Sequence, residues 1–241
     1  MPTLRLQTNI RWKISFKCNI ENCFVPTGVR LYDIIMTSQM RHIHICGAHS
    51  TGKTTLIEFL QSCEDFIGLG ARVQEEVARK VVVEQGITQK MLKDKNIFHD
   101  LNVKIIQALF EKQQEVETKD LKLVLWDRGI MDALTYLLTY VGVVAYEDAL
   151  KMDIVETMLR RWQDGARVLV LVIPPNQKFL KNDGVRMKTN DIMTLQKYHD
   201  VMTSLMNQHN IRFIIIEAED LNERARFVTT TIKQWMKQSP L

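Results

Sequence analysis

The chain has 241 residues, of which 46% are hydrophobic and 25% charged, and its formal net charge is +4. This composition is typical of a soluble globular protein, and the length suits one substantial α/β domain with a short appendage. The excess of basic residues falls mainly on residues 1–39, and the nearly neutral remainder argues against a nucleic-acid-binding surface. No stretch is long and apolar enough to predict a transmembrane helix.

Residues 1–39 differ from the rest of the chain. They contain Pro2 and Pro26, show no sustained hydrophobic period and have no acidic residue before Glu21. A lack of acidic residues is a trait of mitochondrial transit peptides, but serine is scarce and there is no amphipathic arginine face. We therefore expect a disordered or targeting extension over 1–39 and a folded domain over 40–241. The four cysteines lack metal or disulfide spacing, which predicts a reducing compartment, the cytoplasm, with mitochondrial import as an alternative.

Residues 47–54, GAHSTGKT, match the phosphate-binding pattern G-x-x-x-x-G-K-[ST] at every fixed position. The apolar strand-like segment 41–46 precedes them, and apolar residues at helical spacing follow. Glycines let successive backbone N–H groups point into one hollow, where they and the helix N-terminus attract phosphate. The pattern predicts that Lys53 reaches the outer phosphates and that Thr54 holds Mg²⁺. The residues expected to contact ATP, or alternatively GTP, are Gly47, Ala48, His49, Ser50, Thr51, Gly52, Lys53, Thr54 and Thr55.

From residue 41 onward, strands and helices alternate. Predicted strands cover 41–46, 71–75, 121–126, 167–173 and 211–216, and the last three are almost continuously apolar, as in a parallel sheet covered on both faces. Predicted helices cover 53–63, 76–85, 97–118, 130–141, 146–163, 190–209 and 221–237; the third places Phe98, Leu101, Ile105 and Leu109 on one face. The alternation predicts a three-layer α/β domain with a five-stranded parallel sheet, of the P-loop NTPase class.

Ligands of such sheets bind beyond the carboxyl ends of the strands, where Asp127 and Arg128 follow the third strand. Asp127 is expected either to hold Mg²⁺ or to act as the base for an acceptor hydroxyl, and Arg128 to present a planar fork to phosphate. The alternative is structural, with Asp127 capping the helix that starts at Ile130.

Glu76 and Arg79 follow the second strand in the first turn of a helix. Their spacing of three places both at the same end of the sheet, which predicts contact with an acceptor. The structural alternative is that Arg79 simply forms an ion pair with Glu75 or Glu76.

A basic loop containing glycine follows the fourth strand and includes Lys178, Lys181 and Arg186. We expect this loop to close over the nucleotide and to bring Arg186 to the transferring phosphate. The alternative is a solvated loop, and this is the interpretation we favour for the two lysines.

The pattern excludes a signalling GTPase, since neither an Asp-x-x-Gly switch nor an Asn-Lys-x-Asp base reader stands after the strands. From about Met40 to Lys237 the chain instead resembles the NadR-type P-loop domain, a ribosylnicotinamide-kinase-like AAA domain. The resemblance rests on segments 47–54, 76–79, 127–129, 183–186 and 223–227. It implies a nucleoside- or nucleotide-kinase-like fold and transfer of the γ-phosphoryl group of ATP, with catalytic or binding roles for Lys53, Thr54, Asp127 and Arg186.

Two functions fit these observations. The first is a Mg²⁺-dependent phosphotransferase acting on a small hydroxyl acceptor such as a nucleoside or nucleotide. The second is a regulatory protein that binds a protein or lipid partner under control of ATP or GTP. The residue pair after the third strand and the predicted lid favour the enzyme; the sequence leaves its acceptor and oligomeric state open.

Overall fold

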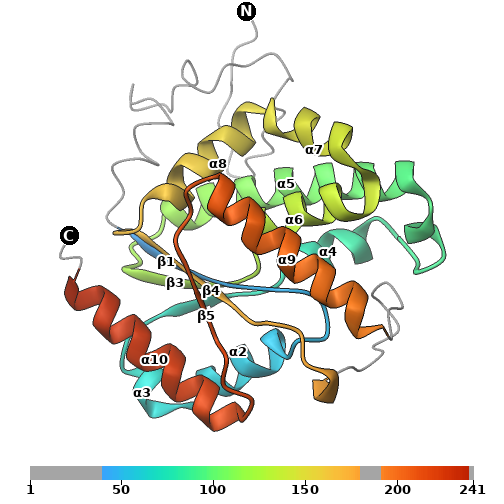
Figure 1. Cartoon of the computed structure of the whole chain (residues 1–241). Coiled ribbons are helices and arrows are strands. Elements are labelled where there is room, and N and C mark those ends of the chain that lie inside the picture. Colours follow the sequence, from blue (N-terminus) through green and yellow to red (C-terminus); the bar gives the residue numbers. More distant parts are fainter. Residues whose placement is uncertain (1–39, 180–190, 239–241) are drawn as a thin grey trace, which may run out of the picture.

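The computed structural model describes residues 40–179 and 191–238, which form a single sheet with helices on both faces (Figure 1). The predicted extension over 1–39 and the predicted lid residue Arg186 lie outside this part of the chain. All neighbouring strands are parallel, in the order β2-β3-β1-β4-β5. Their bounds are Arg41–Cys46 (β1), Arg72–Gln74 (β2), Leu123–Asp127 (β3), Val168–Val172 (β4) and Phe213–Ile215 (β5).

The described helices are α2 (Lys53–Ser62), α3 (Glu64–Ile67), α4 (Val77–Glu84), α5 (Lys95–Glu117), α6 (Ile130–Tyr136), α7 (Val143–Leu150), α8 (Asp153–Gln163), α9 (Ile192–Gln208) and α10 (Leu221–Gln238). Short 3-10 turns occupy Met91–Lys93 and Gln177–Phe179, and a π-helical turn occupies Leu137–Val141. The predicted α/β class and five-stranded parallel sheet are therefore confirmed.

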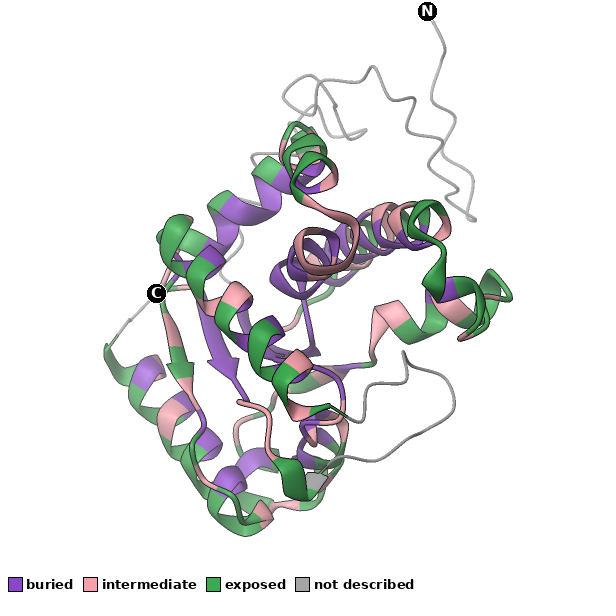
Figure 2. Ribbon diagram, turned by 45° about the vertical axis from the view of Figure 1, so that its right-hand side comes forward, coloured by how far each residue is buried: buried purple, intermediate pink, exposed green. Residues whose placement is uncertain are grey.

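Two helical layers bury the two faces of the sheet. One layer, α2, α3 and α10, packs on Ile43 and Ile45 of β1 and on the side chains of β3 and β4 that point the same way. The other contains α5, α6, α8 and α9 and packs on the opposite side chains of β4, such as Val170 and Val172. Every residue of β1, β3 and β4 is buried, and burial is greatest where the layers meet (Figure 2). This explains why these strands are so apolar in sequence.

Some helix bounds differ from the prediction, for local reasons. The helix α5 starts two residues early because the carboxylate of Asp94 accepts hydrogen bonds from the N–H groups of Asn96 and Ile97. The helix predicted over 146–163 is two helices, since Met152 between them adopts an extended backbone. The helix predicted over 130–141 ends in the π-helical turn, which Gly142 closes with a φ of 133°.

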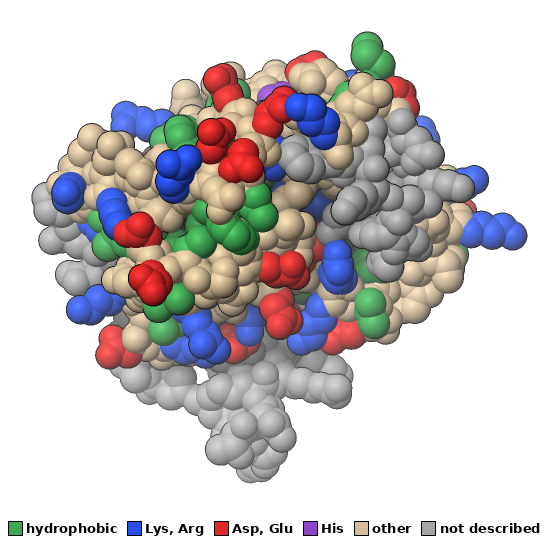
Figure 3. All heavy atoms as spheres, turned by 90° about the horizontal axis from the view of Figure 1, so that it is seen from below, with side chains coloured by type: hydrophobic (Ala, Val, Ile, Leu, Met, Phe, Trp, Pro, Cys, Tyr) green, Lys and Arg blue, Asp and Glu red, His purple; other side chains and the backbone are tan. Residues whose placement is uncertain are grey.

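Charged side chains of both signs are interspersed on the face of the molecule that Figure 3 shows, in keeping with the nearly neutral charge of this part of the sequence. Among the described helices, none is both long and apolar enough to cross a membrane.

Candidate active site

The loop at 47–54 joins β1 to α2 at the carboxyl end of the central strand. Gly47 and Gly52 have φ angles of 139° and 85°, which favour glycine. At Gly47 a side chain is also excluded by space, since an added Cβ would lie 2.5 Å from the carbonyl oxygen of Ile173. The helix α2 begins at Lys53, directly after Gly52. The sequence pattern therefore forms the loop-to-helix geometry that binds phosphate.

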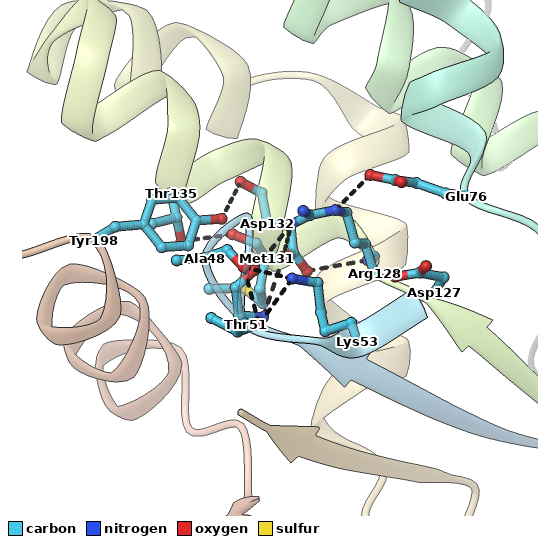
Figure 4. A network of polar contacts seen from close by, with 12 residues as sticks. Ala48, Thr51, Lys53, Glu76, Asp127, Arg128, Met131, Asp132, Thr135 and Tyr198 are labelled. Atoms are coloured by element: carbon cyan, nitrogen blue, oxygen red, sulfur yellow. Dashed lines mark hydrogen bonds and ion pairs between the residues drawn. The ribbon is translucent and has the colours of Figure 1, made fainter. Parts of the chain in front are cut away.

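Lys53 lies across this loop. Its side chain is buried, and its ammonium group donates hydrogen bonds to the carbonyl oxygen of Ala48 and, at 3.2 Å, to the hydroxyl of Thr51 (Figure 4). His49, at a free position of the pattern, is buried as well. The loop thus holds its one cation close to the backbone that would surround a phosphate.

Arg224 of α10 supports the loop from the other side. Its Nη1 donates to the carbonyl oxygen of Thr51 at 3.0 Å, and its Nε donates to the carbonyl oxygen of Ala218 at 2.6 Å. This buried guanidinium therefore links the phosphate loop to the segment that follows β5. The sequence named the arginine only as part of a family resemblance, because the two segments are far apart in the chain.

Asp127 ends β3 beside the loop. Its Oδ2 accepts a hydrogen bond from the hydroxyl of Thr54 at 2.9 Å, whereas its buried Oδ1 has no hydrogen-bond partner within the described residues. Burial, and next the charge of Glu76, raise the pKa of Asp127 above its usual value. A carboxylate oxygen and a hydroxyl side by side are ligands suited to Mg²⁺, and the unpaired Oδ1 fits either a cation or an acceptor hydroxyl.

Arg128 adopts a φ of 74° and is buried. Its Nε lies 2.7 Å from Glu76, and its Nη1 donates to Asp132 and to the carbonyl oxygen of Gly47, both at 2.9 Å. Figure 4 shows the guanidinium between these two carboxylates. Arg128 thus joins the phosphate loop to the starts of α4 and α6, with its charge already paired.

Asp132 was not singled out by the sequence, although it completes this network. Its Oδ2 accepts from the N–H of Gly129 at 3.2 Å, and its Oδ1 accepts from the N–H of Gly47 at 3.4 Å. It is therefore Asp132, rather than Asp127, that caps α6. An acid three residues after the turn-forming Gly129 is the local signal that would have identified it.

Glu76 and Arg79 form the ion pair considered as the alternative from sequence, with 3.5 Å between Oε2 and Nε. The side chain of Glu76 is 11% exposed and that of Arg79 is 47% exposed. Both also line a pocket, so the ion pair and contact with an acceptor are compatible.

This pocket, with a volume of about 110 Å³, opens beside the phosphate loop between α4, α5 and α6. Asp127 and Arg128 line it where β3 ends, and His49 lines it from the loop. Its apolar wall includes the face of α5 formed by Phe98, Leu101, Ile105 and Leu109, together with Tyr136 of α6. The sequence predicted that face of α5, but nothing local to it indicates a cavity rather than a closed core.

A layer of aromatic side chains lies beneath Arg128. The Nδ1 of His44 donates to the carbonyl oxygen of Arg128 at 3.1 Å, and the ring of His44 packs 4.3 Å from that of Trp162. A Cβ on Gly129 would lie 2.3 Å from Trp162 and 2.8 Å from His44, so only glycine fits there. Burial lowers the pKa of His44 to about 3, which keeps its ring neutral.

The sheet order and the phosphate loop after β1 define the P-loop class, with the three-layer fold of nucleoside and nucleotide kinases. A family model described as AAA domain matches residues 42–224, and the chain belongs to this family. No curated protein matches the sequence.

Solved structures resemble the chain in fold. NadR in complex with NR is 18% identical with a TM-score of 0.65, and NadR with NAD and AMP-PNP is 17% identical with a TM-score of 0.62. Each match covers 88% of this chain but 55% and 53% of the NadR chains, so the chain spans about half their length. Deoxyadenosine kinase from M. mycoides, with dCMP and dCDP bound, is 12% identical with a TM-score of 0.52 and matches 80% of this chain and 99% of its own. The fold is that of a NadR-like P-loop domain.

Proposed function

We propose that the chain is an ATP- and Mg²⁺-dependent phosphotransferase, which moves the γ-phosphoryl group of ATP to a hydroxyl of a small acceptor such as a nucleoside or nucleotide. The observation that carries the proposal is the position of Asp127. Its carboxylate accepts a hydrogen bond from Thr54 of the phosphate loop and also lines the pocket beside that loop. One carboxylate therefore lies between a donor site and a cavity large enough for a small acceptor.

The phosphate loop binds the triphosphate of ATP, with GTP as an alternative donor. The N–H groups of residues 47–55 and the N-terminus of α2 surround the phosphate oxygens. Lys53 exchanges its bond to the Ala48 carbonyl for one to the outer phosphates. The charge that develops on the transferring group is then stabilised by a lysine and by backbone dipoles held in place beforehand.

Thr54 and Asp127 are the residues that would hold Mg²⁺, and the ion would supply charge neutralisation between the phosphates. The unpaired Oδ1 of Asp127 fits this role, because a buried carboxylate oxygen without a partner is otherwise unfavourable. The same oxygen would also accept the proton of an acceptor hydroxyl, and the two roles remain alternatives.

In the transfer step, the acceptor oxygen forms a bond to the γ-phosphorus while the bond from that phosphorus to the β,γ-bridging oxygen breaks. ADP leaves, and the acceptor proton passes to Asp127 or to solvent. Glu76 and Arg79 contact the acceptor in the pocket that they line. Arg128 orients Glu76 and the phosphate loop, and its guanidinium adds positive charge near the transferred group. The role expected of Arg186 at the transferring phosphate stays a prediction, because Arg186 lies outside the described residues.

The test is phosphoryl transfer from labelled ATP, with Mg²⁺, to a panel of nucleosides and nucleotides. We expect at least one acceptor to be phosphorylated faster than ATP is hydrolysed, and Lys53→Ala to slow that transfer. Asp120→Asn, an exposed substitution, serves as a control that leaves it unchanged. If water is the best acceptor for every compound and Asp127→Ala does not alter turnover, the phosphotransferase proposal is wrong. A partner affinity that depends on nucleotide would then favour the regulatory alternative.

A further inference from the structure

The pocket contains one polar side chain that the proposed transfer step does not use. Asn102 lies on α5, on the same apolar helix face as Phe98 and Ile105, and is 2% exposed. The other polar side chains that line the pocket come from the phosphate loop, from the segments after β2 and β3, and from the start of α6. Asn102 therefore introduces a buried amide into the otherwise apolar wall that α5 contributes to the pocket.

The amide of Asn102 has a fixed orientation. Its Nδ2 donates to the carbonyl oxygen of Phe98 at 2.8 Å, which is its only hydrogen bond to the described residues. The carbonyl oxygen, Oδ1, accepts no hydrogen bond from the described residues, yet it is not among their fully enclosed unpaired atoms, so it is reached from the pocket that Asn102 lines. A leucine at this position would complete the apolar face of α5 without leaving a polar atom unpaired. The asparagine thus indicates a hydrogen-bond donor that comes from a ligand.

The size and character of the pocket restrict that ligand. The volume of about 110 Å³ is of the order of an engineered apolar cavity of about 150 Å³ that binds benzene. The rings of Phe98 and Tyr136, which both line the pocket, meet edge to face with centroids 6.1 Å apart. The lining carries the carboxylates of Glu76, Asp127 and Asp132 against the guanidinium groups of Arg79 and Arg128, so its charge does not favour an anionic group.

We infer that Asn102 selects the acceptor, by accepting a hydrogen bond from an N–H or O–H group on a ring-sized, otherwise apolar part that the acceptor buries in this pocket. The inference rests on the proposed function, because it treats the pocket as the acceptor site. It adds the chemical class of the buried part: uncharged or cationic, about one ring in size, and carrying a donor. A phosphate or a sugar-like polyol does not meet these requirements.

Aniline and toluene test the inference, because they have nearly the same shape and differ by an NH₂ donor in place of a methyl group. Binding of each to the full chain is measured by ligand-observed NMR at pH 7.5, where aniline is neutral. We expect wild-type protein to bind aniline about 10-fold more tightly than toluene, and Asn102→Leu to remove or reverse this preference. Asn207→Leu, at an exposed position of α9, is the matched control and should keep it.

An unchanged preference for aniline in Asn102→Leu would overturn the inference, as would equal binding of the two compounds by the wild type. Should Asn102→Leu fail to fold, the wild type alone decides: aniline must shift the side-chain NH₂ resonances of Asn102 more than toluene does. The outcomes are separable from the kinase proposal. Intact discrimination without any phosphorylated acceptor removes the proposed function alone, whereas phosphorylation without discrimination removes the role of Asn102 alone.

Discussion

The proposed donor half and the proposed acceptor half of the candidate site are built in different ways. The donor half is a continuous segment, residues 47–55, in which the backbone provides most of the binding groups. The acceptor half is a cavity whose walls come from α4, α5 and α6, in which side chains provide the shape and the polar groups. Backbone binding needs only glycines at fixed positions and a helix start, whereas a side-chain pocket needs three separate elements to pack correctly.

Asp127 and Arg128 are where the two halves meet. Asp127 contacts Thr54 on the donor side and lines the acceptor pocket, and Arg128 contacts Gly47 on one side and Glu76 on the other. The comparison therefore predicts that substitutions at this junction have larger effects than substitutions confined to either half.

The largest effect is expected for Asp127→Asn. Because Asp127 would serve the metal or the acceptor hydroxyl, loss of its charge should lower kcat by about 10²–10⁴-fold. Stability should change in the opposite direction. The pKa of Asp127 is raised by folding, so its stabilising contribution is present below the unfolded pKa and is lost as pH rises through the folded pKa. At neutral pH the buried charge of Asp127 is thus unfavourable, and the neutral asparagine avoids this cost. Each kcal/mol by which the unfolding free energy increases should raise Tm by about 2–4 °C.

Kinetics with labelled ATP and thermal unfolding at pH 7 check these two outcomes on the same preparation. Asp120→Asn, which is exposed, should change neither quantity. A variant that loses activity together with stability would show that Asp127 supports the fold rather than the reaction.

The next effect is a loss of stability in Arg128→Met. This change removes the cation between the half-buried carboxylate of Glu76, which keeps its ion pair with Arg79, and the buried carboxylate of Asp132. A buried ion pair that loses one partner costs about 3–5 kcal/mol. Urea unfolding measures the free energy. Adding Glu76→Gln should recover part of it, since one of the two carboxylates that lose Arg128 becomes neutral. Additive losses in the double variant would contradict the pairing as the source of the effect.

A smaller effect is expected for Arg224→Met, which acts on the donor half alone. It removes two hydrogen bonds from a charged group, one to the phosphate loop and one to the segment after β5. We expect the KM for ATP to rise by about 10-fold, which corresponds to about 1.4 kcal/mol. The KM for the acceptor should not change. Arg226→Met, two residues along the same helix and exposed, is the control. An equal rise in both KM values would mean that the two halves are not separable in this way.

The sequence was sufficient for the donor half because its signal is local. The spacing from Gly47 to Thr54, the strand before it and the helix after it are all visible in one segment, and the structure places them as predicted. The alternation of apolar strands with amphipathic helices likewise predicted the parallel sheet, because burial on both faces dictates the residue types of β1, β3 and β4.

The proposed acceptor half could be predicted only in part. Asp127, Arg128 and Glu76 were named because they follow strands, but their mutual contacts depend on which strands are neighbours. Asn102 and Tyr136 gave no signal, since an asparagine or tyrosine on a long helix has no pattern that distinguishes a pocket wall from a packed interior. The π-helical turn after Tyr136 was also missed, because it depends on Gly142 and on packing rather than on helix propensity.

The smallest effect concerns the aromatic layer that supports the junction from below. Folding lowers the pKa of His44 to about 3, against an ordinary value of 6.5. Because the pKa is lowered, the unfolded chain binds a proton that the folded chain excludes. The contribution of His44 to stability is therefore fully present above pH 6.5 and is progressively lost as pH falls toward 3. The slope from this group approaches about 1.4 kcal/mol per pH unit.

His44→Asn keeps a neutral N–H donor for the carbonyl of Arg128 but removes the titrating ring. Its unfolding free energy should therefore fall less steeply than that of the wild type between pH 6.5 and pH 5, and the difference between the two proteins should be constant above pH 7.5. The slope should not vanish, since burial lowers the pKa of His42 in the same direction. Urea unfolding at pH 8, 7, 6 and 5 gives both curves; parallel curves over the whole range would mean that His44 is not the group that the fold keeps neutral.

The same variant also tests whether the aromatic layer supports only the acceptor half. The phosphate loop is supported by Arg224, so the KM for ATP at pH 8 should be the same in His44→Asn and in the wild type.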